Sequence, residues 1–460
     1  MNAIVISAIW GVVMMFSGAF SKNLKTVRAL SVTGMVLLFA VNLLELYGTH
    51  LFTVDTKGML QFDTFGLLFN AVAFGCTLVY FLLNGRDMEK VGQHVAEYYA
   101  LIFFVLCGIS IGTSFNSLLM LFLAIEIISI PLYILTGADK RNLKSNEASL
   151  KYFLMGAFST GIMLMGIALI FGAKGSFNIE QIALGEGTLT PMVGAGLLLL
   201  MFSLSFKVSA APFHFWTPDV YDGAPTVFTS FMATIVKAGL FIAFIKLFEG
   251  AFGDLHRQWQ TLIAIITAAT LIIGNLTAVF QQSVKRMLAY SSIAQAGFML
   301  FSLVALNGMG KEGLLYYTLA YSVPTIGIFA ILVRMKDYTF EGFNGLAKRQ
   351  PVLAAVTAIF LLSLAGIPAT AGFMGKFYML SAAIQNGHVM WLVIIGIICA
   401  AISVYYYFRV IQAMYFKEGD AQELETSGFH KGLLILMAAF VVLIGIFPQL
   451  LLNQLYAFFS

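Results

Sequence analysis

The feature that most constrains this chain is a series of predominantly apolar segments, each of 18 residues or more, separated by short polar stretches. A helix needs about 20 apolar residues to cross a bilayer, and such long runs lack the alternation of a barrel strand. Of the 460 residues, 60% are apolar and only 10% are charged, whereas soluble domains carry about 25% charged residues. The sequence therefore predicts an all-α integral membrane protein and excludes a water-soluble globule.

Fourteen transmembrane helices are expected, at residues 2–20, 29–48, 63–83, 97–114, 117–137, 147–172, 191–213, 224–248, 259–280, 285–306, 313–335, 351–383, 389–416 and 429–452. No stretch between these segments, such as the polar connection 417–428, is long enough to fold as a soluble domain. We therefore expect one polytopic membrane domain over 1–460. The first segment begins without a basic region or a cleavage site, so we expect a retained helix and not a signal peptide.

Basic residues report the topology of such a chain, because cytoplasmic loops are enriched in Lys and Arg. With fourteen crossings, 18 basic residues fall in odd-numbered loops or at the adjoining helix ends, and 5 fall at even-numbered ones. This asymmetry places the odd-numbered loops in the cytoplasm. Both termini are then predicted on the non-cytoplasmic side.

Four charged residues do not fit this pattern, because they lie inside the predicted spans. They are Lys207, Lys237 and Lys376, which complete the 26 basic residues, and Glu126. A charge at the bilayer centre costs about 2.5–3.5 kcal/mol, so four cost roughly 10–14 kcal/mol, which rivals the about 5–15 kcal/mol stability of a domain. We therefore expect them to face the bundle interior and to form a polar path through the membrane.

The chemistry of these side chains favours a proton relay. Burial and neighbouring charges can bring a lysine to the point of releasing its proton, which an arginine does not do. All three buried bases are lysines, and Glu126 is expected to act as a counter-charge to Lys207. The alternative is that each lysine extends to a membrane interface or forms a static ion pair.

Two predicted spans contain helix-breaking prolines beside a lysine. Pro212 follows Lys207 by five residues, and Pro368 precedes Lys376 by eight. Proline interrupts a helix, and broken helices in corresponding halves of a transporter indicate ion sites. The breaks fall in helices 7 and 12, which predicts two inverted five-helix repeats, helices 4–8 (97–248) and 9–13 (259–416). The alternative is two unrelated kinks.

A second group of polar residues could support the path. Tyr290, Ser291, Ser292 and Gln295 form a cluster near the start of one span, and His214 follows the first break. We interpret the cluster as a water path or, as readily, as a plain interhelical contact; a single histidine is more often structural. Cys76, Cys107 and Cys399 lie singly in different spans, so no metal site, cofactor site or redox centre is expected in this chain.

Several long stretches carry a family resemblance. The segments LFLAIEIISIPLYILTG (121–137), EASLKYFLMGAFSTGIMLMGIALIFGAKGS (147–176), LAYSSIAQAGFML (288–300), GIPATAGFMGKFYML (366–380) and SFKVSAAPFHFWTPDVYDGAPTVFTSFMATIVKAGLF (205–241) resemble subunit N of bacterial respiratory complex I, the NADH:quinone oxidoreductase. The resemblance covers essentially the whole chain. It is most specific at WTPDVYDGAPT (216–226), which varies in the sibling antiporter-like subunits L and M.

The resemblance implies an antiporter-like subunit in the membrane arm of a translocase, in the bacterial inner membrane. Proton pumping would be coupled to quinone reduction elsewhere, and NADH, flavin, iron–sulfur clusters and quinone would be bound by other subunits. Partners would be subunit M, the small membrane subunits beside it and lipid, with no nucleic acid. The family's buried glutamate and three lysines match Glu126, Lys207, Lys237 and Lys376.

One position departs from the family, which often carries histidine where this chain has Gln295. Glutamine does not titrate, so here it could only align water. Two other functions stay open. The chain could be a cation/proton antiporter subunit that exchanges sodium for protons along the same axis, or a structural and assembly subunit of a membrane redox complex whose charges are inert.

Overall fold

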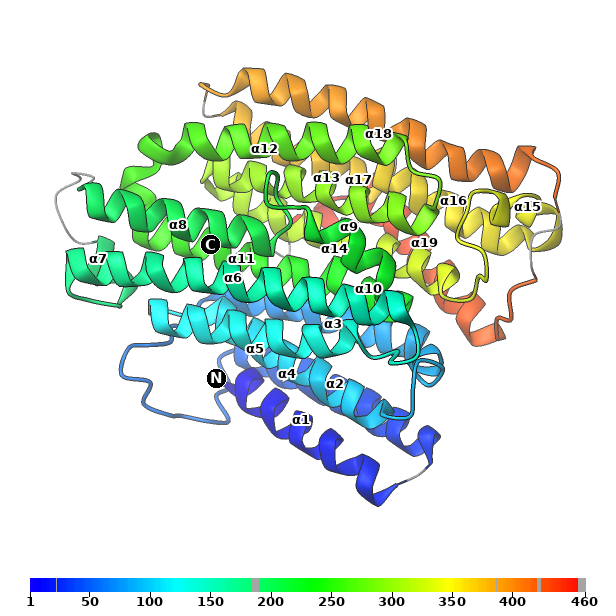
Figure 1. Cartoon of the computed structure of the whole chain (residues 1–460), viewed down its shortest axis with the longest axis horizontal. Helices are drawn as coiled ribbons and strands as arrows, with labels where there is room; N and C mark the ends of the chain where they lie inside the picture. Colours follow the sequence, from blue (N-terminus) through cyan, green and yellow to red (C-terminus); the bar gives the residue numbers. More distant parts are fainter. Residues whose placement is uncertain (22, 184–189, 386, 420–422, 454–460) are drawn as a thin grey trace. The chain divides into compact units, whose positions relative to one another are not determined.

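The computed structural model describes the chain except for residues 22, 184–189, 386, 420–422 and 454–460. The described part is helical and contains no β-strand (Figure 1). Its first helices are α1 (Asn2–Phe20), α2 (Leu24–Leu46), α3 (Thr64–Met88), α4 (Val95–Ser114), α5 (Leu118–Thr136), α6 (Leu143–Lys174), α7 (Ile179–Ala183), α8 (Pro191–Lys207), α9 (Trp216–Gly223), α10 (Thr226–Phe231) and α11 (Lys237–Phe252). The others are α12 (His256–Val279), α13 (Val284–Ala305), α14 (Gly308–Leu332), α15 (Leu346–Arg349), α16 (Pro351–Ala365), α17 (Ala371–Ile384), α18 (Met390–Phe416) and α19 (Gly428–Ile446).

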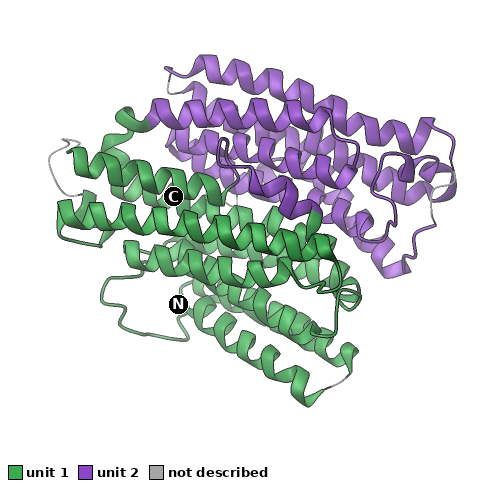
Figure 2. Cartoon of the chain, in the orientation of Figure 1, with its two compact units in different colours: residues 1–208, 223–259 green, residues 209–222, 260–460 purple. Residues whose placement is uncertain are grey.

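The chain divides into two compact units, coloured separately in Figure 2. Unit 1 comprises residues 1–208 and 223–259, and unit 2 comprises residues 209–222 and 260–460. The segment 209–222 therefore follows α8 in the chain but packs as part of unit 2. The predicted repeat 97–248 lies in unit 1 apart from this segment, and 260–416 lies in unit 2.

Eleven helical stretches among the described residues are long and apolar enough to span a membrane. One of them, Thr226–Val279, is 54 residues long and covers most of two predicted segments, 224–248 and 259–280. Two further apolar helices, α8 and α16, are shorter than a full span because each stops at a break. The chain is thus a multi-pass helical membrane protein, as predicted, whereas the count of fourteen crossings stays a prediction.

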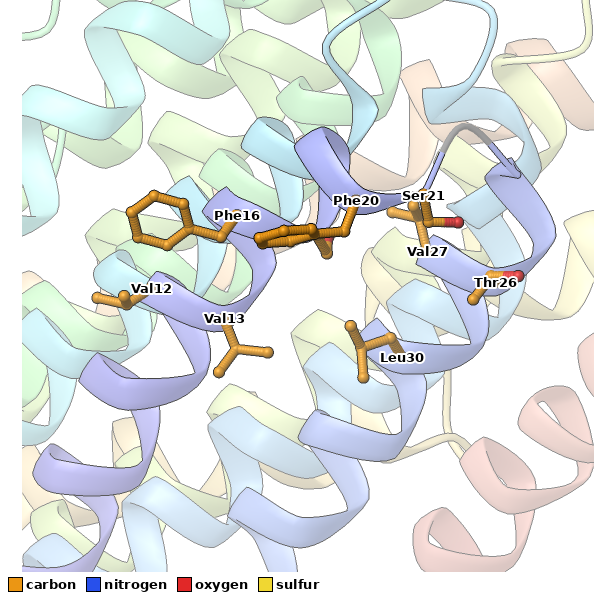
Figure 3. A pocket seen from close by; sticks show the side chains of 9 residues that line it. Val12, Val13, Phe16, Phe20, Ser21, Thr26, Val27 and Leu30 are labelled. Atoms are coloured by element: carbon orange, nitrogen blue, oxygen red, sulfur yellow. The ribbon is translucent and has the colours of Figure 1, made fainter.

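The outer side chains of α1 and α2 in unit 1 are apolar, as expected of a surface that faces lipid. Phe16 is 58% exposed and Phe20 is 88% exposed. These two residues, with Val12, Val13 and Leu30, line a groove of about 580 Å³ between the two helices (Figure 3). Exposed aromatic and aliphatic groups of this size are costly in water, so the surface supports the assignment to the membrane.

In unit 1, α6 packs closely along α8, and glycine makes this contact possible. A Cβ added at Gly166 would lie 3.0 Å from the carbonyl oxygen of Gly196, and one added at Gly196 would lie 2.9 Å from that of Gly166. Small residues allow membrane helices to approach in this way. Gly156 and Gly172 also contact neighbouring side chains, whereas a Cβ at Gly161 would meet nothing within 4 Å.

We expect Gly166→Val to reduce the amount of assembled protein several-fold. The added methyl groups would separate α6 from α8, and overpacking of this kind costs about 1–3 kcal/mol, which changes cellular abundance several-fold. Gly161→Val is the matched control on the same helix, because it adds the same side chain in open space. Quantitative immunoblotting of membranes measures both variants, and equal abundance of the two would contradict the packing role of Gly166.

In unit 2, α14 packs against α16 and α17, and α17 returns close to α16 after the second break. A Cβ added at Gly372 would lie 1.8 Å from the carbonyl oxygen of Ser363, so only glycine fits this approach. The amide of Gly372 also donates to the hydroxyl of Ser363 over 3.1 Å. The two helices on either side of the break are therefore held together at their adjoining ends.

Candidate functional site

The first break begins directly at a predicted lysine. Helix α8 ends at Lys207, and the next helix begins only at Trp216, with Pro212 in the segment between them. Ser209 has a φ of 68°, which side-chain-bearing residues rarely adopt. Such strained residues persist only where the surrounding structure holds them, and they cluster at functional sites. Lys207 itself is 5% exposed.

Lys207 and Glu126 are joined through the hydroxyl group of Thr160, and Lys207 also bonds to that of Ser129. The Lys207 ammonium donates to Ser129 Oγ over 2.9 Å and to Thr160 Oγ1 over 3.5 Å. The Thr160 hydroxyl in turn donates to Glu126 Oε1 over 2.7 Å. Helices α5, α6 and α8 supply these groups, so an acid and a base on separate helices are joined by one directed chain of hydrogen bonds.

This arrangement places an acid and a base within one hydrogen-bonded chain. The base donates and the acid accepts along the chain, which stabilises both in their ionised forms inside a low-dielectric region. Glu126 is half-buried, while Ser129 and Thr160 are buried. The acid is thus the more accessible end of the chain.

Sequence reasoning missed both hydroxyl residues. Ser129 could have been found, because it lies three residues after Glu126 and therefore on the same face of α5. Thr160 had no such signal. It lies on α6 among the glycines that mark a packing surface, and nothing in its neighbours points to a charged partner.

Lys237 is the first residue of α11 and is 2% exposed. A π-helical turn, Met232–Val236, precedes it directly. Single π turns are rare and frequently occur at functional sites. Gly239 packs against Ile109 of α4, which fixes α11 within unit 1. The lysine is therefore held on a closely packed helix at an irregular turn.

The second break, in unit 2, directly precedes the helix that carries Lys376. Helix α16 ends at Ala365, Gly366 follows with a φ of 84°, and Ala369 has a φ of 69° before α17 begins. Lys376 lies on α17 but donates back to the carbonyl oxygens of Leu364 over 3.0 Å and Ala365 over 2.8 Å. These are the last carbonyls of α16, where the helix dipole favours a cation.

Gln295 shares a hydrogen-bond acceptor with Lys376. Its amide donates to the Leu364 carbonyl over 3.1 Å and to the Tyr407 hydroxyl over 3.1 Å, and it accepts from the hydroxyl of Tyr317. Tyr407 also bonds to Ser291. The amide thus uses both its donor and its acceptor atoms, and it links the break to a buried tyrosine pair.

The other polar residues predicted from the sequence are Ser292, Tyr290 and His214. Ser292 donates to the carbonyl of Ala289 on its own helix over 2.8 Å. Tyr290 is half-buried at the same end of α13. His214 is 5% exposed, and its ring stacks on Phe215 with the centroids 4.6 Å apart. The structure therefore joins Ser291 and Gln295 through Tyr407.

A further pair of basic residues holds the segment that contains α9. Lys285 donates to the carbonyl of Asp222 over 2.8 Å, and Arg286 forms an ion pair with Asp219 at 2.9 Å. Lys285 is 3% exposed, although its place at a helix end had indicated only topology.

Neither a metal cluster nor a disulfide occurs among the residues that the structure describes. No group of three or more His, Cys, Asp or Glu side chains is placed to hold a metal ion. Cys76, Cys107 and Cys399 are buried and unbridged.

Comparison with known proteins places the chain in a family. The family described as NADH:quinone oxidoreductase/Mrp antiporter, transmembrane, matches residues 115–403. A relative from Cytophaga hutchinsonii, named NADH-quinone oxidoreductase subunit N, is 40% identical over 98% of this chain and 99% of its own length. The chain belongs to the NADH-quinone oxidoreductase subunit N family. The resemblance inferred from the sequence segments is thereby confirmed.

Two solved structures share the fold of this chain over nearly its whole length. A chain of respiratory complex I from Thermus thermophilus is 31% identical, with a TM-score of 0.85 and coverage of 98% of each chain. A chain of the Mrp complex from Dietzia is 19% identical, with a TM-score of 0.84 over 98% of this chain and 96% of that one. At that identity the likeness shows a shared fold alone.

Proposed function

We propose that this chain is the proton-translocating subunit N of a complex I and that Glu126, Lys207, Lys237 and Lys376 form its proton relay. The observation that carries the relay is the hydrogen-bonded chain from Lys207 through Thr160 to Glu126. It provides an acid and a base whose charges depend on each other within the membrane. The family supplies the context of a redox-driven pump.

The proposed path begins in the cytoplasm. A cytoplasmic half-channel loads Lys207, charge passes in the membrane plane through Lys237 towards Lys376, and the proton leaves on the opposite side. Moving one charge against 100 mV requires about 2.3 kcal/mol. Quinone reduction in other subunits supplies this energy by changing the charge or conformation of the neighbouring subunit.

The topology belongs to the same proposal. The chain crosses a bacterial inner membrane fourteen times, with both termini on the non-cytoplasmic side. The 18 to 5 division of basic residues between the two sets of loops supports this topology. Two inverted five-helix repeats, 97–248 and 259–416, each contain a broken helix. In both halves the break follows a short apolar helix: Lys207 ends α8, and Lys376 donates back to the last carbonyl of α16. His214, Pro212, Pro368 and the Tyr290–Gln295 cluster line the same path.

The partners of the proposed subunit are the antiporter-like subunit M, the small membrane-arm subunits and lipid. NADH, flavin, iron–sulfur clusters and quinone belong to the parent complex. The charge-bearing residues described above need none of these groups to hold or pass a proton. This chain therefore contributes transport, while the oxidoreductase chemistry takes place elsewhere.

The alternative with a specific observation behind it is a multi-subunit cation/proton antiporter, because the Dietzia Mrp chain shares the fold. The two functions differ in companions and in ion dependence. We expect the complex purified through a tag on this chain to contain quinone-reductase subunits and to translocate protons on NADH addition in sodium-free vesicles. Companions limited to antiporter subunits, or proton movement that requires sodium without NADH, would favour the antiporter.

A further inference from the structure

Thr160 occupies the position between the acid and the base of the proposed relay. Its Oγ1 lies 2.7 Å from Glu126 Oε1 and 3.5 Å from Lys207 Nζ. It is only 8% exposed, so protein atoms and not bulk water determine its hydrogen bonds. A hydroxyl has one hydrogen to donate and two lone pairs that accept. Thr160 can therefore accept from Lys207 while it donates to Glu126.

The hydroxyl of Thr160 also has a second acceptor. The carbonyl oxygen of Gly156, one turn earlier on α6, lies 3.1 Å away. Threonine hydroxyls in helices commonly donate to this carbonyl. The single hydrogen therefore has two positions, one directed at Glu126 and one directed at its own helix backbone. The first suits an ionised carboxylate, and the second suits a neutral carboxylic acid, which donates its own hydrogen to Thr160.

We propose that Thr160 is a positioning residue that couples the charge of Glu126 to that of Lys207. This inference rests on the proposed function. When Glu126 is ionised, Thr160 donates to it and presents a lone pair to Lys207, so both charges are stabilised together. When Glu126 is neutral, Thr160 turns to Gly156 and accepts from the carboxylic acid. The Thr160 hydroxyl is then no longer polarised by an ionised carboxylate and accepts less strongly from Lys207. Ser129 remains the nearest acceptor of Lys207.

A purely structural role for Thr160 is less consistent with the contacts around it. The adjacent Ser159 already joins α6 to α8, because its hydroxyl lies 3.1 Å from that of Ser203, and Ser203 donates to the Ser159 carbonyl over 2.8 Å. The glycine pair Gly166 and Gly196 brings the same helices into contact. Thr160 is therefore not needed to hold α6 against α8, and its hydroxyl contacts the two charged groups.

The test removes the hydroxyl without changing the shape of the side chain. We expect Thr160→Val to lower NADH-driven proton translocation of the intact complex in vesicles by about tenfold or more, the size expected when a hydrogen bond to a charged group is lost. Thr160→Ser restores the hydroxyl and should regain most of the wild-type rate. Ser159→Ala, which removes the neighbouring buried hydroxyl, should keep most of the wild-type rate, because Gly166 and Gly196 still hold α6 against α8.

Three results would overturn the role of Thr160: a wild-type rate in Thr160→Val, failure of Thr160→Ser to recover, or an equal loss in Ser159→Ala. If the valine variant does not assemble, Thr160→Ala removes the same hydroxyl and carries the test. Glu126→Ala is measured in parallel. Full translocation by Glu126→Ala would refute the relay itself, whereas loss in Glu126→Ala with normal Thr160→Val refutes only the coupling role.

Discussion

Replacing Lys207 with alanine is expected to abolish most redox-driven proton translocation while the complex still assembles. The change removes the ammonium group that donates to Ser129 and Thr160, at the start of the hydrogen bonds that lead to Glu126. Loss of a proton-transferring group lowers a rate by roughly 10²-fold or more. Glu126→Ala removes the opposite end and should have the same effect. Proton uptake by vesicles on NADH addition measures the loss, and native gels measure assembly.

Two further variants separate proton transfer from charge and packing. Lys207→Arg keeps the positive charge but holds its proton permanently, so it should assemble and fail to translocate. Lys246→Ala is a matched lysine control in the same unit, because Lys246 binds Asp63 over 2.9 Å and the Thr113 carbonyl over 2.8 Å. We expect near-normal translocation from Lys246→Ala. An active Lys207→Arg variant would contradict proton release from this position.

Replacing Lys376 with alanine is the second change with a large expected effect. Its ammonium is the donor to the last carbonyls of α16, Leu364 and Ala365, and it lies 4.9 Å from the ring centroid of Phe298. Removal eliminates the base at the second break, and we expect a loss of translocation similar to that of Lys207→Ala. Vesicle proton uptake and quinone reductase activity, measured on the same preparation, establish the effect.

Lys348→Ala is the control for Lys376 in unit 2. Lys348 is exposed and lies 3.3 Å from Glu418, so its loss should leave translocation unchanged. The double variant Lys207→Ala with Lys376→Ala addresses the assembly hypothesis. If the double variant still translocates protons at the wild-type rate, the buried charges are inert and the chain is a structural subunit.

The sequence predicted the helical membrane fold and the burial of Lys207, Lys237 and Lys376, because both follow from the cost of moving polar groups into lipid; Glu126 is half-buried. The sequence did not predict which residues meet. Thr160 contacts Glu126 and Lys207 across 34 and 47 positions of sequence, and Ser129 contacts Lys207 across 78. Contacts this distant depend on how three helices pack, which a local pattern does not contain.

Lys285 shows the opposite limitation. Its position at a helix end, beside other basic residues, is typical of a loop charge that reports topology. In the structure it is buried and donates to the carbonyl of Asp222, with the ring of Tyr338 5.5 Å away. A partner supplied by the segment 209–222 makes burial of this charge possible, and that segment joins unit 2 only through tertiary packing.

The sequence predicted where the two helix breaks fall, but not how each lysine lies relative to its break. Pro212 and Pro368 fall within the interruptions, after the ends of α8 and α16, because proline lacks the amide that a helix needs. The offsets between proline and lysine differ in the two segments. The structure accounts for the difference: Lys207 ends the helix before its break, whereas Lys376 lies on the helix after its break and reaches back to the carbonyls of α16.

The number of protons translocated per NADH oxidised, measured in vesicles containing the complex with Glu126→Ala or Lys207→Ala, tests the central claim most directly. The proposed relay predicts that this stoichiometry falls sharply in both variants while the complex remains assembled. Full wild-type stoichiometry in either variant would contradict it.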